Sequence, residues 1–242
     1  MSNLLNSVNA LVTLRAWLRD SHQFSVPKLQ RECPICGYKG IFVALGRPSR
    51  WDGRCPACRS NERDRLIWLF LQQRKIDLKD GRDILHFAPE AHFLKLLGSS
   101  PNYHTADITP GRARHLVDIT AIQFPDESFD LVICNHVLEH VERDHIALKE
   151  LFRVLRKGGF ALITVPQNWS RETTYENPRI GDNLAMRYAH YSHLDHVRYY
   201  GRDFEKRMAA AGFRVECWRM PEEDEPRYGL SRDEVLWLGW KT

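Results

Sequence analysis

The stretch Asp118–Val141, DITAIQFPDESFDLVICNHVLEHV, decides the fold of this 242-residue chain. An acidic residue leads into a turn that contains Pro125, and the apolar run Leu131–Cys134 follows. A short apolar run between turn residues predicts a strand that is buried on both faces. Asn135 and His136 then open a predicted helix. Open α/β sheets bind their ligands at such points, where a strand ends and polar residues begin a helix.

Six further segments have the composition of strands, and helical segments alternate with the strands as far as the fifth. These segments are 84–88, 102–107, 116–117, 160–165, 213–218 and 235–240. The pattern predicts an α/β fold with a doubly wound, seven-stranded sheet. Residues 167–200 are too long and too rich in Tyr, His and Arg for a plain connection, which predicts a lid over the carboxyl edge of the sheet.

Four of the six cysteines form two Cys-x-x-Cys pairs, which 18 residues separate. Two such knuckles predict a tetrahedral zinc ribbon, and four protein ligands leave no open position, so the zinc is expected to be structural. The ligands are Cys33, Cys36, Cys55 and Cys58. The six apolar residues Leu66–Leu71 predict a helix that is buried between this ribbon and the sheet.

The predicted organisation has three parts. Residues 1–27 hold an amphipathic helix and a linker, residues 28–78 hold the zinc ribbon and its docking helix, and residues 79–242 form the main domain. The absence of a long apolar run predicts no transmembrane helix, and the N-terminus lacks the pattern of a signal peptide. A cytoplasmic location is the expectation. The net charge of +4 excludes no class of partner.

Two segments carry a resemblance to a known family. The link Phe124–Asp130, FPDESFD, and the helix–LRKGG–strand pattern at 148–165 are similar to class I S-adenosylmethionine-dependent methyltransferases of the type 11 kind. The resemblance implies a Rossmann-like sheet with an antiparallel last strand, and S-adenosylmethionine as the cofactor. It covers about residues 80–240.

The resemblance also implies a set of cofactor contacts. Asp107, at the end of the second strand, would bind the ribose hydroxyls, and Asp118 with Ile119 would bracket the adenine. The first strand should end in a glycine-rich loop, but this chain has no glycine there. Glu90 either holds the ammonium group of the cofactor or only begins a helix. The candidate cofactor-binding residues are His86, Ala88, Glu90, Asp107, Asp118, Ile119 and Asn135.

The segment His136-Val-Leu-Glu139-His140 matches the inverted zinc-peptidase motif, and on a helix its three polar residues would share a face. The surrounding pattern favours a methyltransferase over a peptidase. On that interpretation His136 faces cofactor and acceptor, while His140 is a general base, an orienting residue or a packed core histidine. His196 in the lid is the first candidate for a general base, so the candidate catalytic residues are His196, His136 and His140.

The lid also supplies the candidate acceptor-binding residues, with Arg198 suited to an anionic group. They are Tyr175, Arg198 and Tyr200. The alternative is a lid whose aromatic and histidine side chains only pack. The expected function is methyl transfer from S-adenosylmethionine to an oxygen or nitrogen of a small polar acceptor, such as a sugar, without a catalytic metal.

Two other functions stay open. The ribbon segment 28–65 has nine Lys and Arg against four Asp and Glu, so it could dock an RNA or protein substrate. The missing glycine loop would instead suit a binding module that has the fold without catalysis. The sequence does not determine the oligomeric state.

Overall fold

The computed structural model describes residues 29–45 and 50–242. The predicted amphipathic helix at 4–18 lies outside these residues. Within the described part of the chain, every helix is too short or too polar to span a bilayer.

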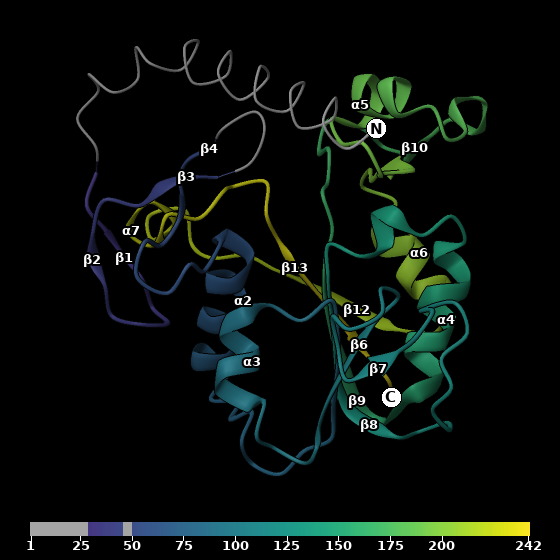
Figure 1. The fold of residues 1–242 in the computed structure, drawn as a ribbon, viewed down its shortest axis with the longest axis horizontal. Helices are drawn as coiled ribbons and strands as arrows, with labels where there is room; N and C mark the ends of the chain where they lie inside the picture. The colour runs from purple at the N-terminus through teal and green to yellow at the C-terminus, as the bar shows by residue number, and fades with distance from the viewer. Residues whose placement is uncertain (1–28, 46–49) are drawn as a thin grey trace.

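A seven-stranded sheet forms the centre of the molecule (Figure 1). Five neighbouring strands are parallel, and the last strand runs antiparallel to its neighbours on both sides. This confirms the predicted Rossmann-like sheet. In spatial order the strands are β12 (Arg214–Trp218), β13 (Leu236–Trp240), β9 (Leu155–Thr164), β8 (Phe129–Asn135), β5 (Ile84–Phe87), β6 (Tyr103–Asp107) and β7 (His115–Leu116).

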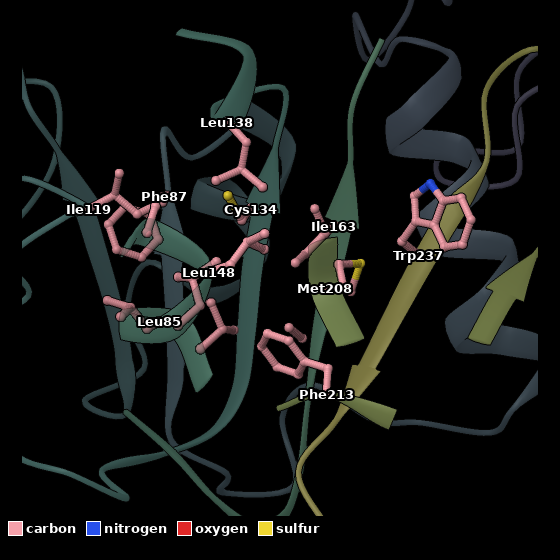
Figure 2. Packing of buried hydrophobic residues seen from close by; sticks show 14 of the residues in the cluster. Leu85, Phe87, Ile119, Cys134, Leu138, Leu148, Ile163, Met208, Phe213 and Trp237 are labelled. Atoms are coloured by element: carbon pink, nitrogen blue, oxygen red, sulfur yellow. The ribbon is translucent and has the colours of Figure 1, made fainter. Parts of the chain in front are cut away.

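Helices cover both faces of the sheet (Figure 1). One face packs against α2 (Glu62–Gln73) and α3 (Ala91–Leu97), and the other against α4 (Asp144–Val154) and α6 (Phe204–Ala210). Alternate strand residues point to opposite faces, so Leu85 and Phe87 lie in the α4 and α6 layer. Figure 2 shows this layer, where the strand side chains face Leu148 and Met208.

The helix α2 belongs to the main fold, because five residues of its apolar run are buried against the sheet. A capping box fixes its start. The side chain of Asn61 accepts a hydrogen bond from the backbone N–H of Asp64, and Oδ2 of Asp64 accepts one from the N–H of Asn61 at 2.7 Å. The helix is thereby set in register beside the first strand of the sheet.

Two expected helices are missing, which corrects the predicted alternation. Loops join β6 to β7 and β7 to β8. The first loop is short and contains Pro110 and Gly111. The second loop, residues 117–128, contains Pro125 and forms only turns, bends and irregular structure. After β8 the chain forms only a single 3₁₀ turn, η2 (Leu138–His140), before α4 begins.

The ribbon consists of two small hairpins, formed by β1 (Arg31–Glu32) with β2 (Lys39–Gly40), and by β3 (Val43–Leu45) with β4 (Arg50–Arg54). It packs beside α7 (Glu225–Tyr228) near the C-terminus. Arg65 of α2 joins the two parts, because its guanidinium donates to carbonyl oxygens of both.

The expected lid has structure of its own. It contains β10 (Tyr175–Glu176), η3 (Pro178–Ile180), α5 (Leu184–Tyr191) and β11 (Arg198–Tyr199), with β10 and β11 paired antiparallel. In Figure 1, α5 and β10 lie above α4 and α6. A backbone hydrogen bond of 2.9 Å from Val197 N–H to Glu139 C=O ties the lid to η2.

Candidate active site and metal centre

Four polar residues lie along one edge of the sheet. Because β5, β6, β7 and β8 are parallel, their carboxyl ends meet at the same edge, and each is followed or closed by a polar residue. These residues are Glu90, Asp107, Asp118 and Asn135. The edge brings together side chains that are up to 45 positions apart in the chain.

The first loop turns sharply without a glycine. Ala88 follows β5 with a φ of +47°, in the left-handed region that glycine usually occupies, and its N–H donates to Ala106 C=O at 2.8 Å. The backbone therefore adopts a glycine-like turn that the sequence did not indicate. A strained backbone of this kind persists where the surrounding structure holds it, often at a functional site.

Replacing Ala88 with glycine is expected to raise the free energy of unfolding by about 1 kcal/mol. The left-handed conformation costs a residue with a Cβ about 1–2 kcal/mol, which glycine does not incur. Glycine also has more conformational freedom in the unfolded chain, which offsets part of this gain in stability. Denaturant unfolding measures the change. The control is Ala91→Gly in the first turn of α3, which should lower stability by up to about 1 kcal/mol. An equal decrease in the free energy of unfolding in both variants would show that the turn at Ala88 is not strained.

Glu90 is held from three sides. Its Oε1 accepts a hydrogen bond from Asn135 Nδ2 at 3.1 Å, its Oε2 lies 2.9 Å from His86 Nε2, and Arg63 Nε lies 3.7 Å from Oε1. Burial opposes ionisation of Glu90, yet the contact with His86 and the charge of Arg63 lower its pKa to about 2. The carboxylate is therefore ionised at neutral pH. Arg63 was not among the residues that the sequence singled out, because only the fold brings α2 to this loop.

His86 acts from inside the protein. Its side chain is fully buried, and Nδ1 lies 2.8 Å from the hydroxyl of Tyr103. It has no surface for a ligand in this structure, so it reaches the edge only through Glu90. This corrects the prediction that His86 itself contacts the cofactor.

Behind Glu90 lie two more titratable residues that the sequence did not single out. Asp64 Oδ2 is 3.7 Å from His92 Nδ1. Burial, together with the charge of Glu90, raises the pKa of Asp64 to about 7, and burial lowers the pKa of His92 to about 4. At pH values between about 4 and 7 both groups are therefore mainly neutral.

Asp107 and Asp118 each form a local turn. Asp107 Oδ1 accepts the N–H of Thr109 at 2.7 Å, and Asp118 Oδ1 accepts the N–H of Thr120 at 2.8 Å. These hydrogen bonds orient both carboxylates at the strand edge. The neighbouring side chains differ. Ile108 is 70% exposed, whereas Ile119 is buried in the core, so only the backbone of Ile119 can take part in ligand binding.

His136 is clamped between two carboxylates. It has a φ of +50° and lies outside any helix, which corrects the expected shared helix face with Glu139 and His140. Its Nε2 lies 2.9 Å from Glu234 Oε1, and its Nδ1 lies 3.2 Å from Glu139 Oε1. Burial opposes the charged ring, but Glu234 and Glu139 raise its pKa to about 9. A ring that is already protonated at neutral pH does not serve as a general base.

His196 meets His140 where the lid contacts η2. The ring centroids are 4.8 Å apart in an edge-to-face arrangement. Burial lowers the pKa of His196 to about 4, so its imidazole is neutral at physiological pH. The structure thus brings these two candidate catalytic residues together, while the ring of His136 lies between Glu139 and Glu234.

Arg198 and Tyr200 hold the lid in place. The Arg198 guanidinium donates to the carbonyl oxygens of Leu138, Val141 and Glu142 and to the carboxylate of Glu176. Tyr200 is fully buried, and its hydroxyl donates to Asp144 at 3.0 Å. Tyr200 therefore packs in the core, which corrects its expected role in contacting an acceptor.

A cavity of about 400 Å³ lies between the lid and the segment after η2. Arg198 forms part of its wall, although the guanidinium is already paired. Tyr175 bonds to His190 within the lid, at 2.7 Å between the hydroxyl and Nδ1. The other wall residues that carry polar groups are Glu142, Glu176, Asn177, Arg187 and Tyr191.

The four cysteines of the ribbon converge on one point. Cys33 Sγ is 3.5 Å from Cys58 Sγ, and Cys36 Sγ is 3.7 Å from Cys55 Sγ. Zinc with Zn–S distances of about 2.3 Å holds the sulfurs of a tetrahedral site about 3.8 Å apart, so the four thiolates fit the ion. Both knuckles close with the same backbone bond, which joins the first cysteine C=O to the N–H four residues later.

Comparison with known proteins supplies a family match. A family model described as a methyltransferase domain matches residues 35–217, which is more than half of the chain. No curated protein matches the chain.

Many solved structures share the fold. The 1,6-didemethyltoxoflavin-N1-methyltransferase of Burkholderia thailandensis is 15% identical with a TM-score of 0.52, over 75% of this chain and 78% of that one. The [4+2]-cyclase SpnF is 14% identical with a TM-score of 0.52, over 78% and 85%. An S-adenosylmethionine-dependent methyltransferase of Mesorhizobium loti is 15% identical with a TM-score of 0.49, over 71% and 96%. Identities this low establish the fold alone.

Proposed function

The chain belongs to the methyltransferase domain family, and on that premise we propose that it transfers the methyl group of S-adenosylmethionine to a small polar acceptor. The observation that carries the proposal is the row of carboxyl and amide side chains along the carboxyl edge of β5, β6, β7 and β8. When bound, the cofactor supplies an electrophilic methyl group on a sulfonium. The protein has to hold the cofactor, align the acceptor and accept a proton.

The edge residues fit the polar groups of this cofactor. The ionised carboxylate of Glu90, fixed by Asn135, suits the ammonium group, and Arg63 beside it suits the carboxylate of the same amino acid. In this proposal Asp107 binds the ribose hydroxyls. Asp118 and the backbone of Ile119 bind the adenine edge, and the exposed side chain of Ile108 offers an apolar surface next to Asp107.

The surroundings of the lid support a small acceptor. The cavity of about 400 Å³ has the size of a small-molecule pocket, and its walls combine carboxylates, an amide and guanidinium groups. The Burkholderia thailandensis enzyme was solved with 1,6-didemethyltoxoflavin and S-adenosylhomocysteine bound, so this fold can hold such a pair. For proton removal, the neutral imidazole of His196 is better suited than the protonated ring of His136.

The ribbon offers less support for an RNA substrate. Several of its arginines are engaged within the protein, since Arg31 pairs with Asp52 at 3.0 Å, Arg54 donates to Asn61 at 3.1 Å and Arg65 is buried. Arginine side chains that are paired or buried within the protein are not available to bind RNA phosphates. We propose that the four cysteines hold a structural zinc ion. RNA binding that weakens steeply with salt would contradict the proposal of a small acceptor.

Calorimetry with S-adenosylmethionine and S-adenosylhomocysteine tests the proposal. Wild-type protein should bind both, and Asp107→Ala should weaken binding by about 1.5–3 kcal/mol, or roughly 10- to 150-fold in Kd, because hydrogen bonds to a charged group are lost. The control is Asp182→Ala, whose side chain is 97% exposed and which should bind as wild type does.

Two outcomes would contradict the proposal. Failure of the folded wild-type protein to bind either ligand would mean that the glycine-free first loop has lost the cofactor. Binding without turnover across oxygen and nitrogen acceptors would favour a binding module, and the cyclase SpnF shows that structures of this fold are not limited to one reaction.

A further inference from the structure

A second group of potential metal ligands lies where the lid meets η2. His140 ends η2, while His193, Asp195 and His196 occupy the loop between α5 and β11. The rings of His193 and His196 stack with their centroids 4.3 Å apart, and His140 stands edge-on to His196. Glu139 lies beneath them. This group is separate from the four cysteines, and the proposed methyl transfer uses only His196 of it.

The donor atoms converge closely enough for one ion. Glu139, His140 and His196 each offer one ligand atom, and these atoms lie within 4.8 Å of one another. His193, Asp195 and His196 form an overlapping group within the same limit. Ligands about 2.0–2.2 Å from a tetrahedral ion are roughly 3.3–3.6 Å apart, so side-chain shifts of about 1 Å would complete the site.

Two polar atoms of these residues are buried without a hydrogen-bond partner among the described residues. They are Oε2 of Glu139, whose side chain is 1% exposed, and Nδ1 of His196. A buried carboxylate oxygen without a partner is costly, and such a group in a native protein calls for an explanation. The other oxygen of Glu139 faces His136, which Glu234 holds from behind. An outer residue of this kind fixes the direction of a metal-binding carboxylate.

We propose that Glu139, His140 and His196 bind a divalent transition-metal ion, with His193 and Asp195 as its nearest neighbours. Two imidazoles and a carboxylate favour Zn²⁺, Co²⁺, Ni²⁺ or Fe²⁺ over Mg²⁺ and Ca²⁺. Since Glu139 and His140 follow β8 while His196 belongs to the lid, the ion would join the lid to the edge of the sheet.

The site also indicates an acceptor class. Three protein ligands leave positions open on the ion, and a hydroxyl oxygen bound there would lose its proton to solvent more readily, with His196 serving as a ligand in place of a base. The acceptor would then be an oxygen compound. This second step rests on the proposed methyl transfer, whereas binding of the ion itself does not.

Calorimetric titration with Co²⁺ tests the site, on protein that holds one equivalent of zinc in the ribbon and no other metal. One further ion should bind per chain, and no zinc should be released into the filtrate. His196→Gln and His140→Gln should each weaken Co²⁺ binding at least 10- to 100-fold, because the loss of an outer partner alone has an effect of that size. His145→Gln is the matched control, since His145 is exposed on α4 and belongs to neither group.

The results separate the two proposals. Absence of a bound Co²⁺ ion beside the zinc of the ribbon in wild-type protein would overturn the site, and so would equal Co²⁺ binding by His145→Gln and both other variants. The wild-type stoichiometry decides the matter even if a variant fails to fold. Co²⁺ binding by a protein that does not bind S-adenosylhomocysteine would leave the metal site standing and contradict the proposed methyl transfer.

Discussion

A Cys55→Ser variant is expected to lose the zinc of the ribbon and, with it, the folded ribbon. Cys55 is fully buried, and the described apolar core of the ribbon is very small, with Phe42 as its one buried aromatic residue. Such a core cannot offset the entropy of ordering the chain, so the ion has to supply most of the stability. Structural zinc binds to zinc-finger peptides with a free energy of about 10–16 kcal/mol. A site with three thiolates binds the ion with only part of this free energy.

Metal analysis by mass spectrometry and limited proteolysis within residues 29–60 measure the two effects. Cys217→Ser is the matched control, because Cys217 is an exposed cysteine of β12 and should leave the zinc of the ribbon in place. The helix α2 should stay packed on the sheet in both variants, since its apolar residues contact the sheet and not the ribbon. Full zinc retention in Cys55→Ser, with unchanged resistance to protease, would show that the cysteines do not form the expected site.

The features that the sequence predicted well are those that neighbouring residues determine. The apolar run Leu131–Cys134 forms the centre of β8, and both Cys-x-x-Cys pairs form knuckles, because each pattern is complete within a few residues. The antiparallel last strand followed from the resemblance, and the structure confirms it. The two absent helices were mispredicted because alternation was extended across loops that contain proline.

The contacts that define the site could not be predicted in the same way. Glu90 meets Arg63 from a helix outside its own strand–loop unit, and His136 meets Glu234 across 98 positions of sequence. The left-handed turns at Ala88 and His136 carry no glycine to mark them. Pairs of this kind depend on the packing of whole elements, so a single sequence without structure gives no signal for them.

These contacts also explain how a loop without glycine can hold its shape. Ala88 N–H is bonded to β6, Glu90 is bonded to Asn135 at the end of β8, and Arg63 approaches from α2. Contacts with three neighbouring elements together hold the turn in its conformation. A strained backbone persists where the surrounding structure fixes it in this way. A glycine-rich loop reaches a similar shape through conformational freedom, whereas this chain reaches it through tertiary contacts.

Replacing Arg65 with methionine is expected to lower the free energy of unfolding by about 3–5 kcal/mol. Arg65 has no exposed surface, and its guanidinium donates to the carbonyl oxygens of Tyr228, Ser60, Gly53 and Gly229 at 2.6–3.2 Å. Methionine fills a similar volume but leaves these oxygens without a donor, at about 1–3 kcal/mol for each one that stays buried and unpaired.

The zinc site adds to this effect. Four thiolates around Zn²⁺ carry a net charge of about −2, and Arg65, which stacks on Phe42 at 4.7 Å, is a buried cation beside them. Its loss removes both the charge partner of the site and the link between the ribbon and Gly229.

Denaturant unfolding of the zinc-loaded protein measures the change. Arg74→Met is the control, because Arg74 ends the same helix with a half-exposed side chain and a surface ion pair to Glu216, so it should cost less than about 1 kcal/mol. Equal stability of the two variants would show that the ribbon and the C-terminal segment are held together by apolar contacts and not by Arg65.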